Sequence, residues 1–528
     1  MINFCVTNNP DQIRGEWTTR KRLDINGSAV WLCYDRGVEL TECQHHWILF
    51  CGILWQGDVT DFIPEETTRQ NGIFYCVVID KVSGRVRAFN DWHDSFHLTY
   101  HVSRRNFIVT NQLTAYGPAF EINRKWFTKA HGTSLQYTVS AGGSEGWDLK
   151  PFGIRGSLTT SPIKEVQYLE NDQSVAIQRV KESNGQHDSF HLTHRVQRTK
   201  HFTGEKPNHD KTWVRAEHDS ESAMVRAKQV IKENCELIKQ KYGDRLIHFC
   251  STGIDSMVLQ SHLDGVPMYG FVVNGDDSSD EKLMVRLYQE FSGVLHRFDP
   301  GSLQQMAEER CAGTGVQKAI DYKLGHMVFM HMRDHYNLGD RVIVQGNYGD
   351  PVFWHGTGHI IHHAIQRWNM TDPQAIWDKC MGIYGFGAPE GAGKNSKRHR
   401  IKLIQACIDE AFPDFASAVK EAIPYVQGQY MTDQLIIDPY SDLRLLALLP
   451  SSDLQTQEKS ILECYIQQSM ISDRLRPYLS PHITNDYSLW SSFVLHKSKL
   501  NTMVVDSILK NLQATGGHDN DKSKTTKT

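Results

Sequence analysis

Hydrophobic residues form short runs over the first 130 residues of the chain. The clearest runs are separated by turn sequences such as Asn26-Gly27 and Ser83-Gly84, and they are Ala29–Tyr34, Trp47–Leu54, Ile73–Ile79 and Phe107–Thr110. Short apolar runs between turns rich in Gly, Asn and Ser are typical of β-strands. The pattern therefore predicts an N-terminal region built mainly of antiparallel strands.

From residue 222 onward the pattern alternates between helix and strand. Ser222–Lys241 has apolar residues at helical spacing, and Gly243 follows as a helix terminator. The predicted elements after it alternate in type and are strand 246–250, helix 256–263, strand Met268–Val273, helix Glu281–Phe291, strand Val294–Phe298, helix Tyr322–His335 and strand Arg341–Gln345. This alternation predicts a doubly wound parallel sheet, and residues 360–510 are predicted to be mostly helical.

The length and the local composition divide the chain into four parts. A chain of 528 residues is too long for a single hydrophobic core. We expect a first domain over 1–200, a polar linker over 201–220, a second domain over 221–512 and a disordered tail over 513–528.

Composition and charge restrict the possible partners. The chain is 40% hydrophobic and 22% charged, with a net charge of −4 and eleven cysteines. This balance gives no electrostatic reason to expect nucleic acid or an anionic membrane as a partner. No apolar run has the length of a membrane span, no signal peptide is evident, and the cysteines lack CxxC pairs. We expect a cytoplasmic protein with reduced thiols.

The most informative stretch follows the predicted strand 246–250. It reads Ser251-Thr252-Gly253-Ile254-Asp255-Ser256 and leads directly into a predicted helix. A turn of small residues at a helix N-terminus binds anions, because free backbone N–H groups and the helix dipole both favour negative charge. A carboxylate inside such a turn would repel phosphate unless a divalent cation lies between them. The stretch predicts a site for pyrophosphate and magnesium.

A second loop of small and acidic residues follows the predicted strand 341–345. It reads Gly346-Asn347-Tyr348-Gly349-Asp350. If the two strands are neighbours in a parallel sheet, Asp255 and Asp350 emerge at the same edge. Two carboxylates at adjacent strand ends predict a magnesium pair around a triphosphate.

These motifs resemble those of a known enzyme family. The stretch 251–256 is similar to the S-G-G-x-D-S loop of the N-type ATP pyrophosphatases, and the order of further matches resembles asparagine synthetase and its relatives. Those matches are Asp280-Glu281 for a D-E pair, 346–353 for G-E-G-x-D-E-x-F and Pro439-Tyr440-Ser441-Asp442 for P-F-L-D. In the N-terminal half, Phe50–Leu54 stands in place of N-G-E-I-Y, and Asn71–Phe74 in place of D-G-x-F.

The resemblance implies a fold and a reaction. The fold would be an α+β sandwich of the N-terminal nucleophile glutaminase type, followed by an α/β ATP pyrophosphatase domain. The reaction would use ATP and Mg²⁺ to adenylate a small-molecule carboxylate, which ammonia or another amine then attacks, with release of AMP and pyrophosphate. A homodimer is one option for its assembly.

The resemblance also implies roles for individual residues. The ligands of ATP would include Ser251, Thr252, Gly253, Ile254, Ser256, Val272 and Gly346. Asp255 and Asp350 would hold magnesium. Val272 would contact adenine through its backbone, and Asn347 occupies the position of a glutamate that handles the incoming amine.

The N-terminal domain departs from the family at the residues needed to hydrolyse glutamine. The family nucleophile is an N-terminal cysteine, whereas position 2 here is Ile. Cys5 would become N-terminal only after cleavage behind Phe4. Cys51 replaces an Asn that helps to bind glutamine, and Asn71 replaces an Asp. We expect this domain to be degenerate and not to hydrolyse glutamine.

Three further hypotheses stand beside the ammonia- or amine-using ligase. The first is a non-catalytic ATP-binding or regulatory relative, because Asn347 and Pro351 replace acids and the family's late lysine has no clear match. The second is a glutamine-hydrolysing asparagine synthase produced by processing at Cys5. The third is a relative that closes lactam or macrolactam rings.

One repeat has no role in these hypotheses. His93–Thr99 and His187–Thr193 both read His-Asp-Ser-Phe-His-Leu-Thr. A pair of His/Asp metal sites is one interpretation. Two strands with similar alternation, or a local duplication, is the one we favour, because no further ligand cluster lies at a recognised metal-binding spacing.

Overall fold

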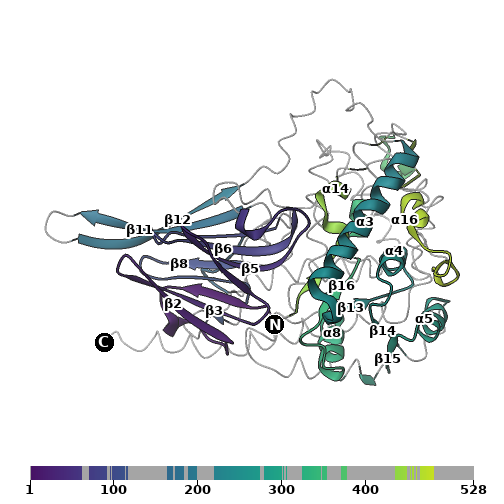
Figure 1. Ribbon diagram of the computed structural model, residues 1–528, viewed down its shortest axis with the longest axis horizontal. Helices are drawn as coiled ribbons and strands as arrows, with labels where there is room; N and C mark the ends of the chain where they lie inside the picture. The colour runs from purple at the N-terminus through teal and green to yellow at the C-terminus, as the bar shows by residue number, and fades with distance from the viewer. Residues whose placement is uncertain are drawn as a thin grey trace, which may run out of the picture.

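The computed structural model describes the protein in a series of ranges. These are 2–61, 71–91, 98–112, 163–169, 173–183, 188–198, 219–273, 279–299, 324–346, 348–353, 370–376, 434–446 and 464–480, together with single residues and pairs between them (96, 115–116, 301–302, 305, 448, 452, 455–456, 459–460). Within these ranges, antiparallel sheets come first and a parallel sheet follows (Figure 1). The predicted tail 513–528 and nearly all of the predicted linker lie outside the described residues.

The first antiparallel sheet has the strand order β10-β8-β9-β1-β3-β2. Its strands are β1 (Phe4–Thr7), β2 (Thr19–Ile25), β3 (Ser28–Tyr34), β8 (Thr99–Val102), β9 (Phe107–Thr110) and β10 (Gln167–Tyr168). β1 lies in the interior of the sheet, paired with β3 on one side and β9 on the other.

The second antiparallel sheet has the order β12-β11-β7-β6-β5-β4. Its strands are β4 (Glu39–Glu42), β5 (His46–Leu54), β6 (Gly72–Asp80), β7 (Val86–Asn90), β11 (Gln173–Ser183) and β12 (Asp188–Arg198). The predicted antiparallel region is confirmed. Figure 1 shows β11 and β12 as a long hairpin, and β12 contains most of the second copy of the repeat. The first copy is described only at Phe96, Leu98 and Thr99, where β8 begins.

The two sheets share one hydrophobic core. Phe4 of the first sheet stacks on Tyr75 of the second, with 4.5 Å between the ring centroids. Val6 and Val77 belong to the same buried cluster. Each fully buried side chain of this size stabilises the fold by about 1.5–3 kcal/mol. The N-terminal region is therefore a sandwich of two sheets.

The parallel region begins with α3 (Ser220–Tyr242), close to the predicted helix. The Asp219 side chain caps its N-terminus by accepting a hydrogen bond from the Ser222 N–H, and the Ser222 hydroxyl accepts one from the Asp219 N–H. Gly243 ends it with a φ of 51°, which glycine adopts without strain. Among the helices that the structure describes, none has both the length and the apolar character needed to cross a membrane.

The parallel sheet has the order β15-β14-β13-β16-β17. Its strands are β13 (Leu246–Phe249), β14 (Met268–Val273), β15 (Val294–Phe298), β16 (Val342–Val344) and β17 (Ile436–Ile437). The helices described between them are α4 (Ile254–His262), α5 (Ser279–Glu290) and α8 (Leu324–His335). The predicted parallel sheet is confirmed, whereas β17 lies in a segment predicted to be mostly helical. The strand order reverses between β13 and β16, where ligands bind in such sheets.

Gly52 in β5 predicts a large difference between two glycine substitutions. Its φ is 127°, and a Cβ there would lie 2.0 Å from the Ile73 carbonyl oxygen. Gly27 also has a positive φ, 72°, but its Cβ would meet nothing within 4 Å. We expect Gly52→Ala to lower the free energy of unfolding by more than about 3 kcal/mol and Gly27→Ala by about 1 kcal/mol. Urea denaturation measures both, and equal losses would contradict the close strand approach.

Candidate functional site

The predicted site lies where the strand order reverses. β13 and β16 are parallel neighbours, with Leu246 opposite Val342 and His248 opposite Val344. The two strands are therefore neighbours, which is the condition on which the predicted pairing of Asp255 with Asp350 depends. The loops that follow them, 251–256 and 346–353, leave the sheet at the same carboxyl edge.

The first loop is closed by hydroxyl hydrogen bonds. The Ser251 hydroxyl accepts from the Gly253 N–H at 3.2 Å and donates to the Ser256 hydroxyl at 3.0 Å. Gly253 is the N-cap of α4 and provides no side-chain cap. The first-turn amides of 254–256, together with the helix dipole, give this loop the character of an anion site. Thr252 is buried, and its carbonyl accepts from the Ser480 N–H.

The Asp255 side chain of the first loop lies against the second loop. Its carboxylate accepts a hydrogen bond from the Gln467 side-chain amide at 3.1 Å. Its backbone carbonyl accepts from the Tyr440 hydroxyl at 2.9 Å. A Cβ on Gly349 would lie 2.1 Å from the Asp255 Cγ, so only glycine at 349 permits this approach. The carboxylate is therefore held directly against the backbone of the second loop.

The second loop is held by a buried acid. The Tyr348 N–H donates to Asp438 at 2.9 Å, just before α9 (Gly349–Val352). Gly346 lies close to Tyr440, since a Cβ there would be 3.1 Å from that ring. Asn347 lies outside the described residues, and of Asp350 only the backbone, within α9, is described. The pairing of Asp350 with Asp255 therefore stays a prediction.

Val272 lies at the same edge of the sheet, near the end of β14 on the other side of β13. It is buried and pairs in register with Arg297 of β15. This position is compatible with the predicted backbone contact to adenine.

Asp438–Arg444, which we name the connector segment, joins both loops to the N-terminal region. Asp442 is fully buried and accepts hydrogen bonds from the Asn71 side chain at 2.8 Å and from the Arg444 guanidinium at 2.8 Å. The Ser441 hydroxyl accepts from the Trp55 indole at 3.2 Å. Arg444 also binds Glu233 of α3 at 2.6 Å, and this hydrogen bond lowers the pKa of the Glu233 carboxyl.

Gln467 was not predicted as part of the site, and the connector segment was noted only through the motif match at Pro439-Tyr440-Ser441-Asp442. Gln467 is fully buried in α16 (Tyr465–Met470), and its carbonyl oxygen has no hydrogen-bond partner among the residues that the structure describes. A carboxamide in a short helix gives no local sequence signal. Its importance is visible only once α16 is placed beside α4.

The cysteines of the N-terminal region are poor candidates for a nucleophile. Cys5 is fully buried within β1, and burial raises the pKa of its thiol well above the usual value. Burial also raises the pKa of Cys51 to about 12. The reactive form of cysteine is the thiolate, so both thiols are held in the unreactive form. The Asn71 side chain donates to Asp442 and accepts from the Leu443 N–H.

In the described part of the chain, no group of three or more His, Cys, Asp or Glu side chains could hold a metal ion. The predicted magnesium site has only two carboxylates, Asp255 and Asp350, so it falls below this threshold of three. Only its Asp255 side chain lies among the described residues. Magnesium binding at this edge therefore stays a prediction.

Comparisons with known proteins add no family assignment. No protein-family model matches the chain, and no curated protein matches its sequence. The roles of the site residues therefore rest on the geometry described above and on the sequence motifs.

His248 predicts a specific pH dependence of stability. The ring is fully buried in β13, bonds to the Gln260 side chain of α4 at 2.7 Å, and burial lowers its pKa to about 4. The unfolded chain binds the proton near pH 6.5, so the stabilising effect of the neutral ring is lost as the pH falls from that value. We expect the free energy of unfolding to fall by about 3 kcal/mol between pH 6.5 and pH 4 because of this residue.

Urea denaturation across this pH range tests the expectation. His248→Asn should flatten the pH dependence. His262, whose pKa burial also lowers to about 4, should add to the dependence in the same sense, so His262→Gln should flatten it as well. An unchanged slope in His248→Asn would contradict the assignment of a neutral buried ring.

Gly349 predicts a second matched comparison. Its substitution by Ala must move the Asp255 carboxylate or the α9 turn. We expect Gly349→Ala to lower the free energy of unfolding by about 1–3 kcal/mol. Gly339→Ala, where nothing lies within 4 Å of a Cβ, should change it by less than about 0.5 kcal/mol. Thermal and urea denaturation compare the two, and a neutral Gly349→Ala would contradict the contact.

Proposed function

We propose that the protein is an asparagine-synthetase-like ligase. It uses ATP to adenylate a carboxylate, aspartate or another acid, and passes the acyl group to ammonia or another amine, releasing AMP and pyrophosphate. The observation that most supports this proposal is the contact between loops 251–256 and 346–353 at the reversal of strand order. Asp255 joins the two loops there.

The first loop has the donors that a pyrophosphate requires. The backbone amides at the start of α4 and the Ser251 and Ser256 hydroxyls lie together. Ser251 and Gly253 are exposed, so an anion can reach them. Fixed donors of this kind stabilise the charge that develops on a leaving pyrophosphate.

The Asp255 carboxylate supports binding of Mg²⁺ beside that anion. Magnesium prefers oxygen ligands and commonly binds through one or two carboxylates plus phosphate oxygens. Gln467 donates to one carboxylate oxygen and thereby fixes the orientation of the group. When bound, the metal would neutralise negative charge on the phosphates.

Features of the N-terminal sandwich favour ammonia or another amine, rather than glutamine, as the nitrogen source. Its sheets resemble in outline the arrangement implied by the glutaminase family. Cys5 and Cys51 are buried, and the Asn71 side chain is bonded to the connector segment. We propose that this domain supports the synthetase region mechanically and does not release ammonia from glutamine.

Isotope exchange between labelled pyrophosphate and ATP, screened over carboxylic acids, tests the proposal. We expect exchange with at least one acid. Asp255→Asn should reduce the exchange rate by about 100-fold or more, because it removes a carboxylate that would hold the Mg²⁺ which neutralises the phosphates. Asp264→Asn, an exposed change just beyond α4, is the matched control and should leave the rate unaltered.

The outcomes separate the competing functions. Binding of Mg-ATP without exchange for any acid would favour the non-catalytic relative over the ligase. If the protein neither binds Mg-ATP nor catalyses exchange, both the ligase and the non-catalytic ATP-binding relative are contradicted. Full exchange in Asp255→Asn would contradict the role of this carboxylate.

A further inference from the structure

Three histidines meet where α8 packs against β15, the edge strand of the parallel sheet. The centroid of the His296 ring in β15 lies 5.4 Å from that of His331 and 5.1 Å from that of His335, both in α8. His331 and His335 are one helical turn apart, and their rings stack nearly parallel with 5.8 Å between centroids. We name these three residues the histidine cluster. Each ring in it therefore neighbours both of the others.

The His296 ring is the most enclosed member of the cluster. Its Nδ1 lies 2.9 Å from the Tyr336 hydroxyl, and the Phe298 ring packs against it at 4.3 Å between centroids. His296 is half-buried, whereas His331 and His335 are exposed. Burial, followed by the two neighbouring histidines, lowers the pKa of the His296 imidazole. Protons therefore reach the cluster from solvent, but a charge on it is disfavoured while α8 is docked.

The charged groups on the elements packed here are paired with one another. Arg333 and Asp334 of α8 form an ion pair at 2.9 Å. Arg297 of β15 lies 3.5 Å from Glu281 of α5. Within the part of the chain that the structure describes, no carboxylate forms an ion pair with the histidine cluster. A second proton on the cluster would therefore meet another imidazolium and no bonded acid.

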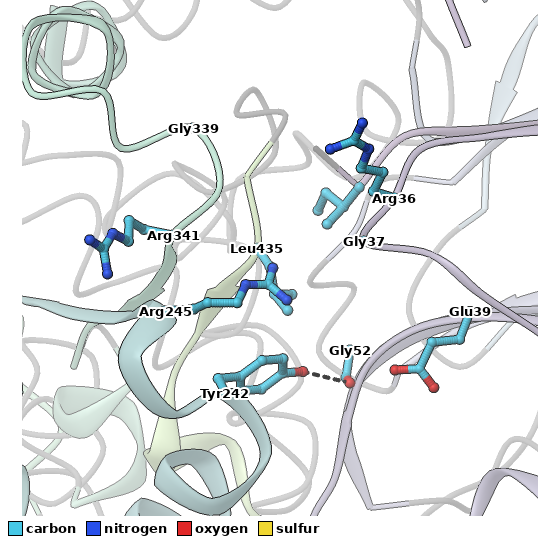
Figure 2. Close-up of a pocket in the computed structure, with 10 residues that line it drawn as sticks. Arg36, Gly37, Glu39, Gly52, Tyr242, Arg245, Gly339, Arg341 and Leu435 are labelled. Atoms are coloured by element: carbon cyan, nitrogen blue, oxygen red, sulfur yellow. Dashed lines mark hydrogen bonds between the residues drawn. The ribbon is translucent and has the colours of Figure 1, made fainter. Parts of the chain in front are cut away.

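Further groups lie at the ends of these elements and on β14. Asp299, just after β15, accepts a hydrogen bond from a backbone N–H of the turn that follows. Arg341, in the turn after α8, donates to the Asp244 carbonyl and borders the pocket drawn in Figure 2. β14 presents the Tyr269 ring, whose centroid is 5.8 Å from that of Tyr336. The three imidazoles are therefore the groups whose charge changes together at this contact.

We propose that the histidine cluster is an acid-sensitive contact, which holds α8 against β15 while its rings are neutral and releases the helix once more than one ring is protonated. Two unit charges at these separations on a partly hydrated surface disfavour double protonation by roughly threefold to tenfold. In the released state each imidazole takes up a proton near its ordinary value of about pH 6.5. The released state therefore binds more protons, so the contact is fully stabilising above that pH and weakens as the pH falls below it.

The contact lies beside the candidate ATP site in the sheet. β15 pairs with β14, and Val272 of β14 stands opposite Arg297 in that pairing. Acidification would therefore loosen the edge of the sheet next to the strand predicted to contact adenine. The proposal does not depend on the ligase reaction.

Hydrogen–deuterium exchange of the full chain at about pH 7.5 and about pH 5.5, with exchange times scaled to the intrinsic rates, tests the proposal. We expect the protection of α8 to fall about tenfold relative to that of α3, as follows for three mutually repelling imidazoles. His331→Gln or His335→Gln removes one charge and should reduce the change to about threefold, and the double variant should show almost none. His45→Gln, at an exposed histidine of the N-terminal region, is the matched control and should keep the tenfold change.

Salt gives a second readout that a merely structural role would not move. In about 1 M salt the screening length is about 3 Å, shorter than the ring separations, so the change in the wild type should shrink. The proposal is overturned if the protection of α8 falls no more than that of α3. It is also overturned if the double variant, shown by circular dichroism to be folded, keeps the full change. If the double variant does not fold, an undiminished tenfold change in both single variants overturns it.

Discussion

Two fully buried carboxylates, Asp438 and Asp442, hold the connector segment to the rest of the molecule. Asp438 accepts from the Tyr348 N–H and so fixes the second loop, while Asp442 accepts from Asn71 and Arg444. Buried carboxylates are costly unless they are paired and hydrogen-bonded, and removal of one partner leaves that cost uncompensated. The position of both candidate loops therefore depends on this short segment.

The connector segment links the N-terminal sandwich to the parallel-sheet region. Trp55 and Asn71 reach it from one side, and the Tyr440 hydroxyl reaches the Asp255 carbonyl on the other. Asn71 occupies a position where the resembled family has a glutamine-binding acid. Here its amide donates to the buried Asp442 of the connector segment. The connector segment therefore hydrogen-bonds both to the sandwich and to Asp255.

The parts of the fold that were predictable are those with local patterns. β14 and α3 follow from apolar periodicity, and the parallel sheet follows from the alternation of strands and helices. The adjacency of β13 and β16 entered the sequence analysis only as a condition, because strand order depends on contacts remote in sequence. β17 is only two residues long, and it forms a strand because it pairs in parallel with β16, which is remote in sequence. Gln467 was missed for a similar reason, since its contact with Asp255 depends on how distant helices pack. The turn from β13 into α4 was predictable because its small residues and its helix are contiguous in the sequence.

The central claim is that loops 251–256 and 346–353 form one ligand site through Asp255. Hydrogen–deuterium exchange of the full chain with and without Mg-ATP tests it most directly. We predict slower exchange in both loops together, with the same dependence on ATP concentration, and loss of both effects in Asp255→Asn. Protection of one loop alone, or of neither at saturating Mg-ATP, would contradict the account.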